Sequence, residues 1–279
     1  MADFYKSQII LRENLFFQEI SYIISNEVRN EKEFQVLNYT GMKITDMHSH
    51  ILPGLDDGAK TIEETLFVLE EAQRQNVGRI IVTPHFHPEH YPLSGTQVRE
   101  TLQRVQQACA ERGISVELYA GQECFYHTGL LKDLEEGKAL TLADSRYVLV
   151  EFDPQCPYFY LQRGLQELIR HGYFPILAHY ERYACLSEEE QLEELKWQGV
   201  LLQLNFDTLR RHGRWFRGNP FQKDLKAGFV DYLGSDCHGT KFRPLRIREA
   251  CRWLEKHLSE EWLEKILHIN IERILEDGT

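Results

Sequence analysis

Several features that mark whole classes of protein are missing from this sequence. No stretch approaches the roughly 18 consecutive apolar residues of a transmembrane helix, so we expect no membrane span. The N-terminus has no basic start followed by an apolar run, so we expect no secretory signal. Positive charge is scarce, because 32 Lys and Arg stand against 43 Asp and Glu and give a formal charge of −11. Since an acidic surface repels a phosphate backbone, we also expect no nucleic-acid partner.

Cysteine is thinly spread and shows no paired spacing. The six cysteines include no Cys-x-x-Cys pair. In a chain of 279 residues this pattern favours free thiols in a reducing compartment, so we expect a cytoplasmic protein. The length, with 42% hydrophobic and 27% charged residues, suits one large domain with a sizeable core.

The first 41 residues differ in character from the rest of the chain. Residues 16–24 have an amphipathic pattern, but residues 29–33 are highly charged and no strand partner is evident. Met42 stands immediately before the first apolar strand pattern. We therefore expect residues 1–41 to be a dispensable N-terminal extension and residues 42–279 to form the functional domain.

From Met42 onward, strand-like and helix-like patterns alternate, which is typical of α/β architecture. Thr61 is an expected helix N-cap, Ser187 and Glu190 an expected capping box, and Gly113 an expected helix end. The expected helices span residues 61–75, 97–112, 161–170, 187–198, 247–257 and 260–268. One expected strand starts at Ile44, and the others span residues 79–85, 115–123, 147–152, 174–179, 200–205 and 229–236.

The first strand carries a pattern that suits a metal. His48 and His50 point the same way in an extended chain, and the carboxylates of Asp56 and Asp57 follow just before Gly58. Neutral imidazole and carboxylate together suit divalent first-row ions. A surface His-x-His pair beside an Asp-Gly turn has the same pattern, so this motif alone leaves both interpretations open.

The other strands decide between these interpretations, because each ends in a polar side chain. These residues are His48, His50, His85, Glu123, Glu151, His179, Asn205, Asp236 and His238. All but the asparagine can ligate a metal. Since parallel barrels build their sites at the C-terminal ends of several strands, the sequence predicts a site for more than one metal ion. His87 and His90, in the loop after the second strand, are expected to rim this pocket.

Two arginines follow the strand ends closely. Arg182 lies three residues beyond His179, and Arg243 lies five residues beyond His238. Guanidinium groups match phosphate oxygens in a bidentate manner, so we expect both to bind a phosphate at the same rim. The alternative for each is a surface salt bridge.

A competing motif is the spacing Cys237-x5-Arg243, which cysteine-nucleophile phosphatases use to bind phosphate. This loop lacks the Gly-rich interior that would point backbone N–H groups at an anion. Asp236 and Pro244 replace the residues that usually flank such a loop. The pattern therefore favours metal chemistry over a thiolate nucleophile.

Taken in order, these residues resemble the polymerase-and-histidinol-phosphatase (PHP) superfamily. They are most similar to the bacterial metal-dependent protein-tyrosine phosphatases of capsule and exopolysaccharide operons. The matching motifs cover the chain from Met42 onward, and they are Asp46-Met-His-Ser-His50, Leu52-Pro-Gly-Leu-Asp-Asp-Gly58, Thr83-Pro-His85, Gly121-Gln-Glu123, Leu149-Val-Glu-Phe152, Ala178-His-Tyr-Glu-Arg-Tyr183 and Ser235-Asp-Cys-His238.

The resemblance implies a single-domain, distorted (β/α)7 barrel of the PHP type with up to three divalent ions. Manganese is the implied metal, with iron, zinc and magnesium as alternatives. Carried over by position, one ion would be held by His48, His50, Glu123 and Asp236. A second would be held by Glu123, Glu151 and His179, and a third by Asp57, His85 and His238. Arg182 and Arg243 match positions that bind the substrate phosphate.

The implied activity is hydrolysis of protein phosphotyrosine by a metal-bound hydroxide. The implied partner is the tyrosine-rich tail of an autophosphorylating kinase that controls polysaccharide export. A histidinol-phosphate or other small-molecule phosphatase on the same metal cage is the alternative. A non-catalytic PHP module is disfavoured because the ligand set is complete. Tyr180 and the aromatic, His-rich loop from His85 to Tyr91 depart from the family pattern, which leaves substrate preference open.

Overall fold

The computed structural model describes residues 43–210 and 219–279. The amphipathic segment 16–24 and the expected extension 1–41 lie outside the described residues. Within the described parts, no helix has both the length and the apolar character needed to cross a membrane.

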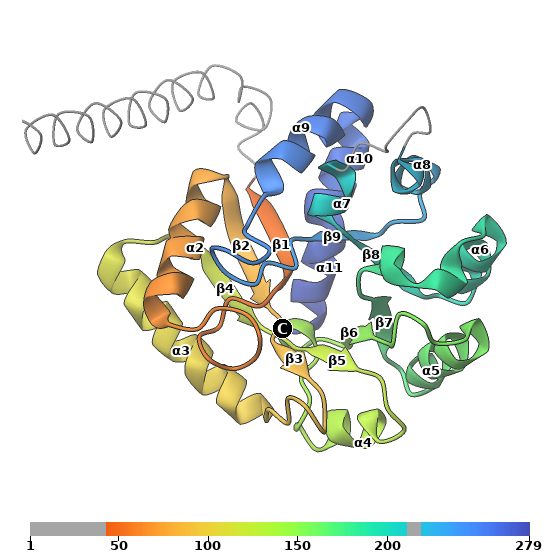
Figure 1. Ribbon diagram of the computed structural model, residues 1–279, viewed down its shortest axis with the longest axis horizontal. Coiled ribbons are helices and arrows are strands. Elements are labelled where there is room, and N and C mark those ends of the chain that lie inside the picture. Colours follow the sequence, from red (N-terminus) through yellow and green to blue (C-terminus); the bar gives the residue numbers. More distant parts are fainter. Residues whose placement is uncertain (1–42, 211–218) are drawn as a thin grey trace, which may run out of the picture. The chain divides into compact units, whose positions relative to one another are not determined.

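The core of the fold is a set of parallel strands arranged in two sheets (Figure 1). The three-stranded sheet has the order β1-β2-β4 and the six-stranded sheet the order β3-β5-β6-β7-β8-β9. The strands are β1 (Ile44–Ser49), β2 (Val77–Val82), β3 (His85–Phe86), β4 (Glu117–Ala120), β5 (Glu123–Phe125), β6 (Tyr147–Glu151), β7 (Phe174–Leu177), β8 (Leu201–Asn205) and β9 (Tyr232–Gly234).

Within the described ranges, the nine strands occupy seven strand positions of a barrel. Strand β3 continues the direction of β2 after a short break, and β5 continues β4 in the same way. The segment after β9 runs beside the end of β1, since the His50 N–H donates to the Cys237 carbonyl at 2.8 Å and the Asp236 N–H to the His48 carbonyl at 2.8 Å. The expected distorted (β/α)7 barrel is confirmed.

Helices α2, α3, α5 and α6 lie outside the strands (Figure 1). Thr61 caps α2 as expected, because its side chain accepts a hydrogen bond from the Glu64 N–H at 3.2 Å, and α3 ends at Gly113 with φ of 69°. The helices are α2 (Ile62–Arg74), α3 (Gly95–Arg112), α4 (Leu130–Glu135), α5 (Tyr158–Arg170), α6 (Glu189–Trp197), α7 (Phe206–Arg210), α8 (Pro220–Ala227), α9 (Ile247–His257), α10 (Glu260–Glu264) and α11 (Asn270–Asp277).

Several local predictions are wrong. The single strand expected over 79–85 is two strands, since β2 ends at Val82 and β3 begins at His85. The single strand expected over 115–123 is two strands, because the chain breaks at Gly121, where an added Cβ would meet the Leu142 side chain at 2.8 Å. The cap of α6 is Glu188, paired with Gln191, and not Ser187. Ser187 already has helical backbone angles, whereas an N-cap needs the extended backbone that Glu188 adopts.

The C-terminal helix packs into the same core as the strands. Ile271 and Ile274 of α11 join a buried apolar cluster that includes Met47, Ile81 and Ile176 from three strands. A π-helical turn over Lys265–Ile269 connects α10 to α11. The helix expected over 260–268 therefore ends too early, because α11 continues to Asp277. The last residues of the chain therefore help to hold the barrel.

We predict that Ile274→Ala destabilises the protein by about 2–4 kcal/mol, because it leaves a cavity in a core that the surrounding residues fill only partly. The matched control is Ile269→Ala, since Ile274 is 0% exposed and Ile269 is 42% exposed. Urea unfolding followed by circular dichroism gives both values. Equal losses in the two variants would contradict the assignment of α11 to the core.

Candidate metal centre

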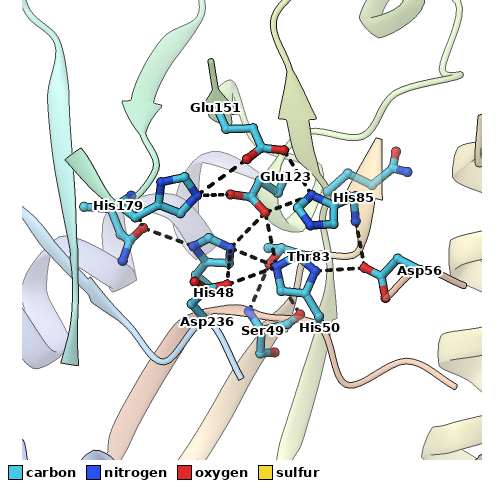
Figure 2. Close-up of polar contacts among 12 residues, drawn as sticks. His48, Ser49, His50, Asp56, Thr83, His85, Glu123, Glu151, His179 and Asp236 are labelled. Atoms are coloured by element: carbon cyan, nitrogen blue, oxygen red, sulfur yellow. Dashed lines mark hydrogen bonds and ion pairs between the residues drawn. The ribbon is translucent and has the colours of Figure 1, made fainter. Parts of the chain in front are cut away.

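All nine residues predicted as metal ligands lie in one cluster at the C-terminal ends of the strands. His48 lies in β1 and His50 follows this strand directly, His85 and Glu123 open β3 and β5, and Glu151 ends β6. Figure 2 shows the centre of this cluster. The remaining members follow their strands directly or lie in the loops, and they are Asp57, His179, Asp236 and His238.

Glu123 is the centre of the cluster. Its Oε2 lies 3.2 Å from Nε2 of His48, 3.1 Å from Nε2 of His50 and 3.1 Å from Nδ1 of His85. Its Oε1 lies 2.6 Å from Nε2 of His179. Burial acts to raise the pKa of Glu123, but attraction to the imidazoles outweighs it and holds the pKa well below its usual value. A carboxylate that faces imidazole nitrogens with both oxygens would offer a ligand atom on either side.

His48 and His50 aim their Nε2 atoms at a common point, with the two atoms 3.1 Å apart. Their Nδ1 atoms are already occupied by acceptors, His48 with Gln203 Oε1 at 3.0 Å and His50 with Asp56 Oδ2 at 2.8 Å. An imidazole that donates from Nδ1 keeps a lone pair on Nε2. Both lone pairs therefore face the interior of the cluster, where a cation would sit.

Asp57 lies between two further histidines. Its Oδ1 is 3.5 Å from Nε2 of His85 and 3.4 Å from Nε2 of His238. The hydrogen bond with His238 is the largest influence on Asp57 and lowers its pKa. Nδ1 of His238 is turned to the Asp236 carbonyl oxygen at 2.9 Å, which leaves Nε2 for the site.

Three groups of donor atoms among the described residues are close enough to hold an ion. They are His50, Asp57, His85 and His238; His48, His50 and Asp236; and His85, Glu123 and Glu151. In the three ligand sets implied by the family resemblance, His50 and His85 each belong to one set, whereas here each belongs to two groups. His179 belongs to none of the three groups, although its Nε2 lies 2.6 Å from Glu123 and 3.6 Å from Glu151.

The donor set fits divalent cations. It combines imidazole with carboxylate, the ligand types of borderline and hard first-row ions. The Oε2 atom of Glu123 is buried and has no hydrogen-bond partner, although leaving such an atom unsatisfied is costly. A bound cation would satisfy it.

Arg182 and Arg243 lie beside the cluster and both bind Asp236. The Arg182 guanidinium donates to Asp236 Oδ2, and the Arg243 guanidinium donates to the same oxygen at 3.2 Å. The other oxygen of Asp236 faces His48 at 3.7 Å and His50 at 3.5 Å. Each arginine therefore forms a salt bridge, as in the alternative interpretation, but with a partner that belongs to the cluster.

Both arginines line a pocket of about 530 Å³ that opens beside Asp236. Asn205, Phe221 and Arg246 line the same pocket. Its volume lies within the roughly 300–1,000 Å³ that is usual for small-molecule sites. The pocket is large enough to admit more than a phosphate group.

Three site residues have left-handed backbone angles, which ordinary side chains rarely adopt. These are His179 with φ of 34°, Asp236 with φ of 51° and Arg243 with φ of 45°. Non-glycine residues in this region cost energy and are concentrated at functional sites. The turns after β7 and β9 place His179 next to Glu123 and Arg243 next to Asp236.

Sequence reasoning missed Gln203 of β8. Its Oε1 accepts hydrogen bonds from Nδ1 of His48 at 3.0 Å and from the His179 N–H at 2.8 Å, and its Nε2 donates to Asn205 at 2.9 Å. The available signal was its position two residues before Asn205 in an apolar strand, which places both on one face.

Two aspartates near the first histidines also have positioning roles. Buried Asp46 accepts hydrogen bonds from the Ser235 N–H at 2.7 Å and from the Ser235 hydroxyl at 2.5 Å, which ties β1 to the segment after β9. Asp56, which the sequence pattern offered together with Asp57 as a metal-binding carboxylate, accepts from the His85 N–H at 2.9 Å. Both lie behind the ligands and hold them in place.

The remaining candidates lie apart from the donor groups. His87 and His90 belong to none of the three groups found in the described ranges. Cys237 is fully buried, its thiol is turned to the Gly239 carbonyl at 3.6 Å, and burial raises its pKa to about 12. A thiol in this setting is a poor nucleophile.

We predict that Gln203→Leu weakens metal binding about 10- to 100-fold, because His48 and His179 lose the acceptor that orients them. The control is Gln107→Leu, since the exposed Gln107 bonds to Glu111 on the same helix and lies outside the donor groups. Calorimetric titration of the metal-free protein with Mn²⁺ measures both affinities. Unchanged affinity in a folded Gln203→Leu variant would show that this side chain has no positioning role.

Comparison with known proteins finds relatives that are named tyrosine-protein phosphatases. The chain is 28% identical over 246 residues to the tyrosine-protein phosphatase CpsB of Streptococcus pneumoniae, covering 83% of this chain and 98% of that protein. It is 30% identical over 243 residues to the tyrosine-protein phosphatase YwqE of Bacillus subtilis, covering 84% of this chain and 92% of that protein.

Solved structures agree with this comparison. Crystal structures of YwqE from Bacillus subtilis and CpsB from Streptococcus pneumoniae, described as metal-dependent tyrosine phosphatases, superpose with a TM-score of 0.75 at 28% identity, covering 85% of this chain and 96% of that chain. An amidohydrolase from Mycoplasma synoviae shares the fold alone, with a TM-score of 0.56 at 13% identity over 83% of this chain and 87% of that chain.

The family model for capsular polysaccharide synthesis, CpsB/CapC, matches residues 44–276. The resemblance drawn from the sequence motifs is confirmed. The chain belongs to the CpsB/CapC family of capsular polysaccharide synthesis.

Proposed function

We propose that this protein is a metal-dependent protein-tyrosine phosphatase, a phosphoric monoester hydrolase. The observation that carries the proposal is the buried cluster of imidazoles and carboxylates with two arginines at its edge. Support also comes from relatives that are named tyrosine-protein phosphatases. The chemistry of the cluster and the names of the relatives point to the same reaction.

The residues that would hold divalent ions are those carried over from the family. They are His48, His50, Glu123 and Asp236 for one ion; Glu123, Glu151 and His179 for a second; and Asp57, His85 and His238 for a third. When bound, divalent ions supply a hydroxide nucleophile near neutral pH and positive charge beside the phosphoryl oxygens. We propose manganese as the ion, with iron, zinc and magnesium able to use the same ligand types.

The chain's own residues bind and orient the substrate. A guanidinium has five N–H donors in a fixed plane, so Arg182 and Arg243 can each bind Asp236 and still offer donors to phosphate oxygens. Asp236 limits the rotation of both arginines. Gln203 and Asp56 hold the histidines in the tautomers that leave Nε2 facing the site.

The proposed substrate is phosphotyrosine on a protein, namely the tail of an autophosphorylating kinase of capsule or exopolysaccharide synthesis. The membership of the CpsB/CapC family supports this substrate class. We also propose a cytoplasmic location and assign the activity to residues 42–279, since every residue named in the site lies in this part of the chain.

We predict that a chelator abolishes hydrolysis of a phosphotyrosine peptide and that added Mn²⁺ restores it. Cys237→Ser should retain most of the activity, because the thiol is buried and its pKa is raised to about 12. Histidinol phosphate, assayed in parallel, tests the small-molecule alternative on the same cage. Full activity in excess chelator together with loss in Cys237→Ser would overturn the metal mechanism.

We predict that Arg182→Lys lowers kcat/KM for a phosphotyrosine peptide at least about tenfold, although the charge is kept. Lysine offers no planar fork to phosphate oxygens, and misplacement of the phosphate by about 1 Å can cost roughly a hundredfold. Steady-state kinetics with a parallel measurement of metal content separates lost orientation from lost metal. The control is Arg112→Lys at the end of α3, outside the pocket. If Arg182→Lys and Arg182→Ala both equal the wild type, this arginine does not bind the phosphate.

A further inference from the structure

An exposed aromatic side chain lies next to the site without a role in the metal cluster. Phe242 is 61% exposed and precedes Arg243 in the loop after β9. Its ring stands edge-on to the ring of His238, with centroids 6.0 Å apart and planes at 89°. The Arg243 guanidinium carbon lies 5.1 Å from the centre of the Phe242 ring. Phe242 therefore contacts one residue of the cluster and one of the two phosphate-binding arginines.

A second aromatic side chain packs on the other histidine that faces Asp57. The ring of Tyr91 stacks on the ring of His85 with centroids 5.4 Å apart and planes at 16°. Its backbone is held by two hydrogen bonds to His87, of 3.0 and 2.9 Å. The rings of His85 and His238 are themselves 6.1 Å apart. The two aromatic rings thus adjoin the same donor group, Tyr91 through His85 and Phe242 through His238.

We propose that Phe242 and Tyr91 form an aryl subsite that binds the phenyl ring of a phosphotyrosine whose phosphate lies against Arg182 and Arg243. The inference rests on the proposed function and adds the means by which an aryl phosphate is chosen over an alkyl phosphate. The ring of phosphotyrosine begins one ester oxygen away from phosphorus, so a ring-binding surface must adjoin the phosphate site. Phe242 meets this condition through its contact with Arg243.

The energetic argument also favours a ligand at Phe242. Single exposed apolar side chains are common and need no explanation, and Phe159 is 70% exposed on α5. Phe242 differs because its ring already contacts an imidazole edge-on and a guanidinium, the arrangements that aromatic quadrupoles favour. A substrate ring would cover its exposed part and gain the same kind of contact.

The competing explanation is that Phe242 only positions Arg243. A contact with Phe242 on one side and a hydrogen bond to Asp236 on the other restrict the Arg243 guanidinium. Loss of the ring would then weaken every phosphate ligand equally, whether or not the ligand carries a phenyl group. The two explanations differ in this one measurable respect.

The test compares two competitive inhibitors, phenylphosphonate and methylphosphonate, against hydrolysis of a phosphotyrosine peptide by the Mn²⁺-loaded full chain. Neither is hydrolysed, so the better leaving group of an aryl ester does not enter the comparison. We expect Phe242→Ala to raise the Ki of phenylphosphonate about three- to tenfold and that of methylphosphonate less than twofold. Tyr91→Ala should likewise raise the Ki of phenylphosphonate more than that of methylphosphonate. Phe242→Tyr should keep the wild-type ratio of the two Ki values.

Phe159→Ala is the matched control, because it removes an equally exposed phenyl ring outside the site. Its ratio of Ki values should equal that of the wild type. A parallel rise of both Ki values in Phe242→Ala would assign Phe242 to positioning Arg243 and overturn the aryl subsite, as would unchanged Ki values. Absence of any phosphotyrosine hydrolysis by the wild type would instead overturn the proposed function, and the aryl subsite with it.

Discussion

The site depends on one buried carboxylate and the imidazoles around it. Glu123 has no exposed surface, and a buried charge is costly unless opposite charge and donors compensate it. Four histidines surround its two oxygens, and a cation bound among them would supply this compensation. The break in the strand at Gly121 lets the chain turn into the second sheet and places Glu123 at their centre. Each of these histidines is therefore fixed relative to the same pair of oxygen atoms.

Asp236 connects this cluster to the two arginines that line the pocket. One of its oxygens faces His48 and His50, and the other accepts hydrogen bonds from Arg182 and Arg243. A phosphate held by these arginines would lie next to the donor atoms of the cluster. In a chain with a formal charge of −11, these two guanidinium groups and the bound cations would supply the local positive charge that a doubly negative substrate group needs.

The aromatic residues at the edge of the site add selectivity to a cluster that by itself would serve many phosphate esters. Imidazole, carboxylate and guanidinium groups bind metal and phosphate but do not discriminate between the alcohols of different phosphate esters. Phe242 and Tyr91 lie where that part of the substrate would be bound. Binding of the phosphate and choice of the ester are thus assigned to separate residues.

The sequence by itself determined the alternation of strands and helices, because each element carries its own periodicity and caps. It also showed which residue types stand at the strand ends. Because parallel strands end at one edge of the barrel, these residues had to gather there. Their chemistry could be recognised without knowing how the strands pair. Helix boundaries such as Thr61 and Gly113 were predictable for the same local reason.

Only the tertiary structure decided which donors meet. The grouping of His50 with His85 and His238 depends on how β1, β3 and the loop after β9 pack, and no local pattern encodes a distance between them. The left-handed backbone at His179 and Asp236 and the role of Gln203 arise in the same way. Phe242 had no sequence signal at all, because an exposed phenylalanine becomes informative only when its neighbours are known. The residue types can be read from the sequence, whereas the contacts that form the site join strands that are far apart in the sequence.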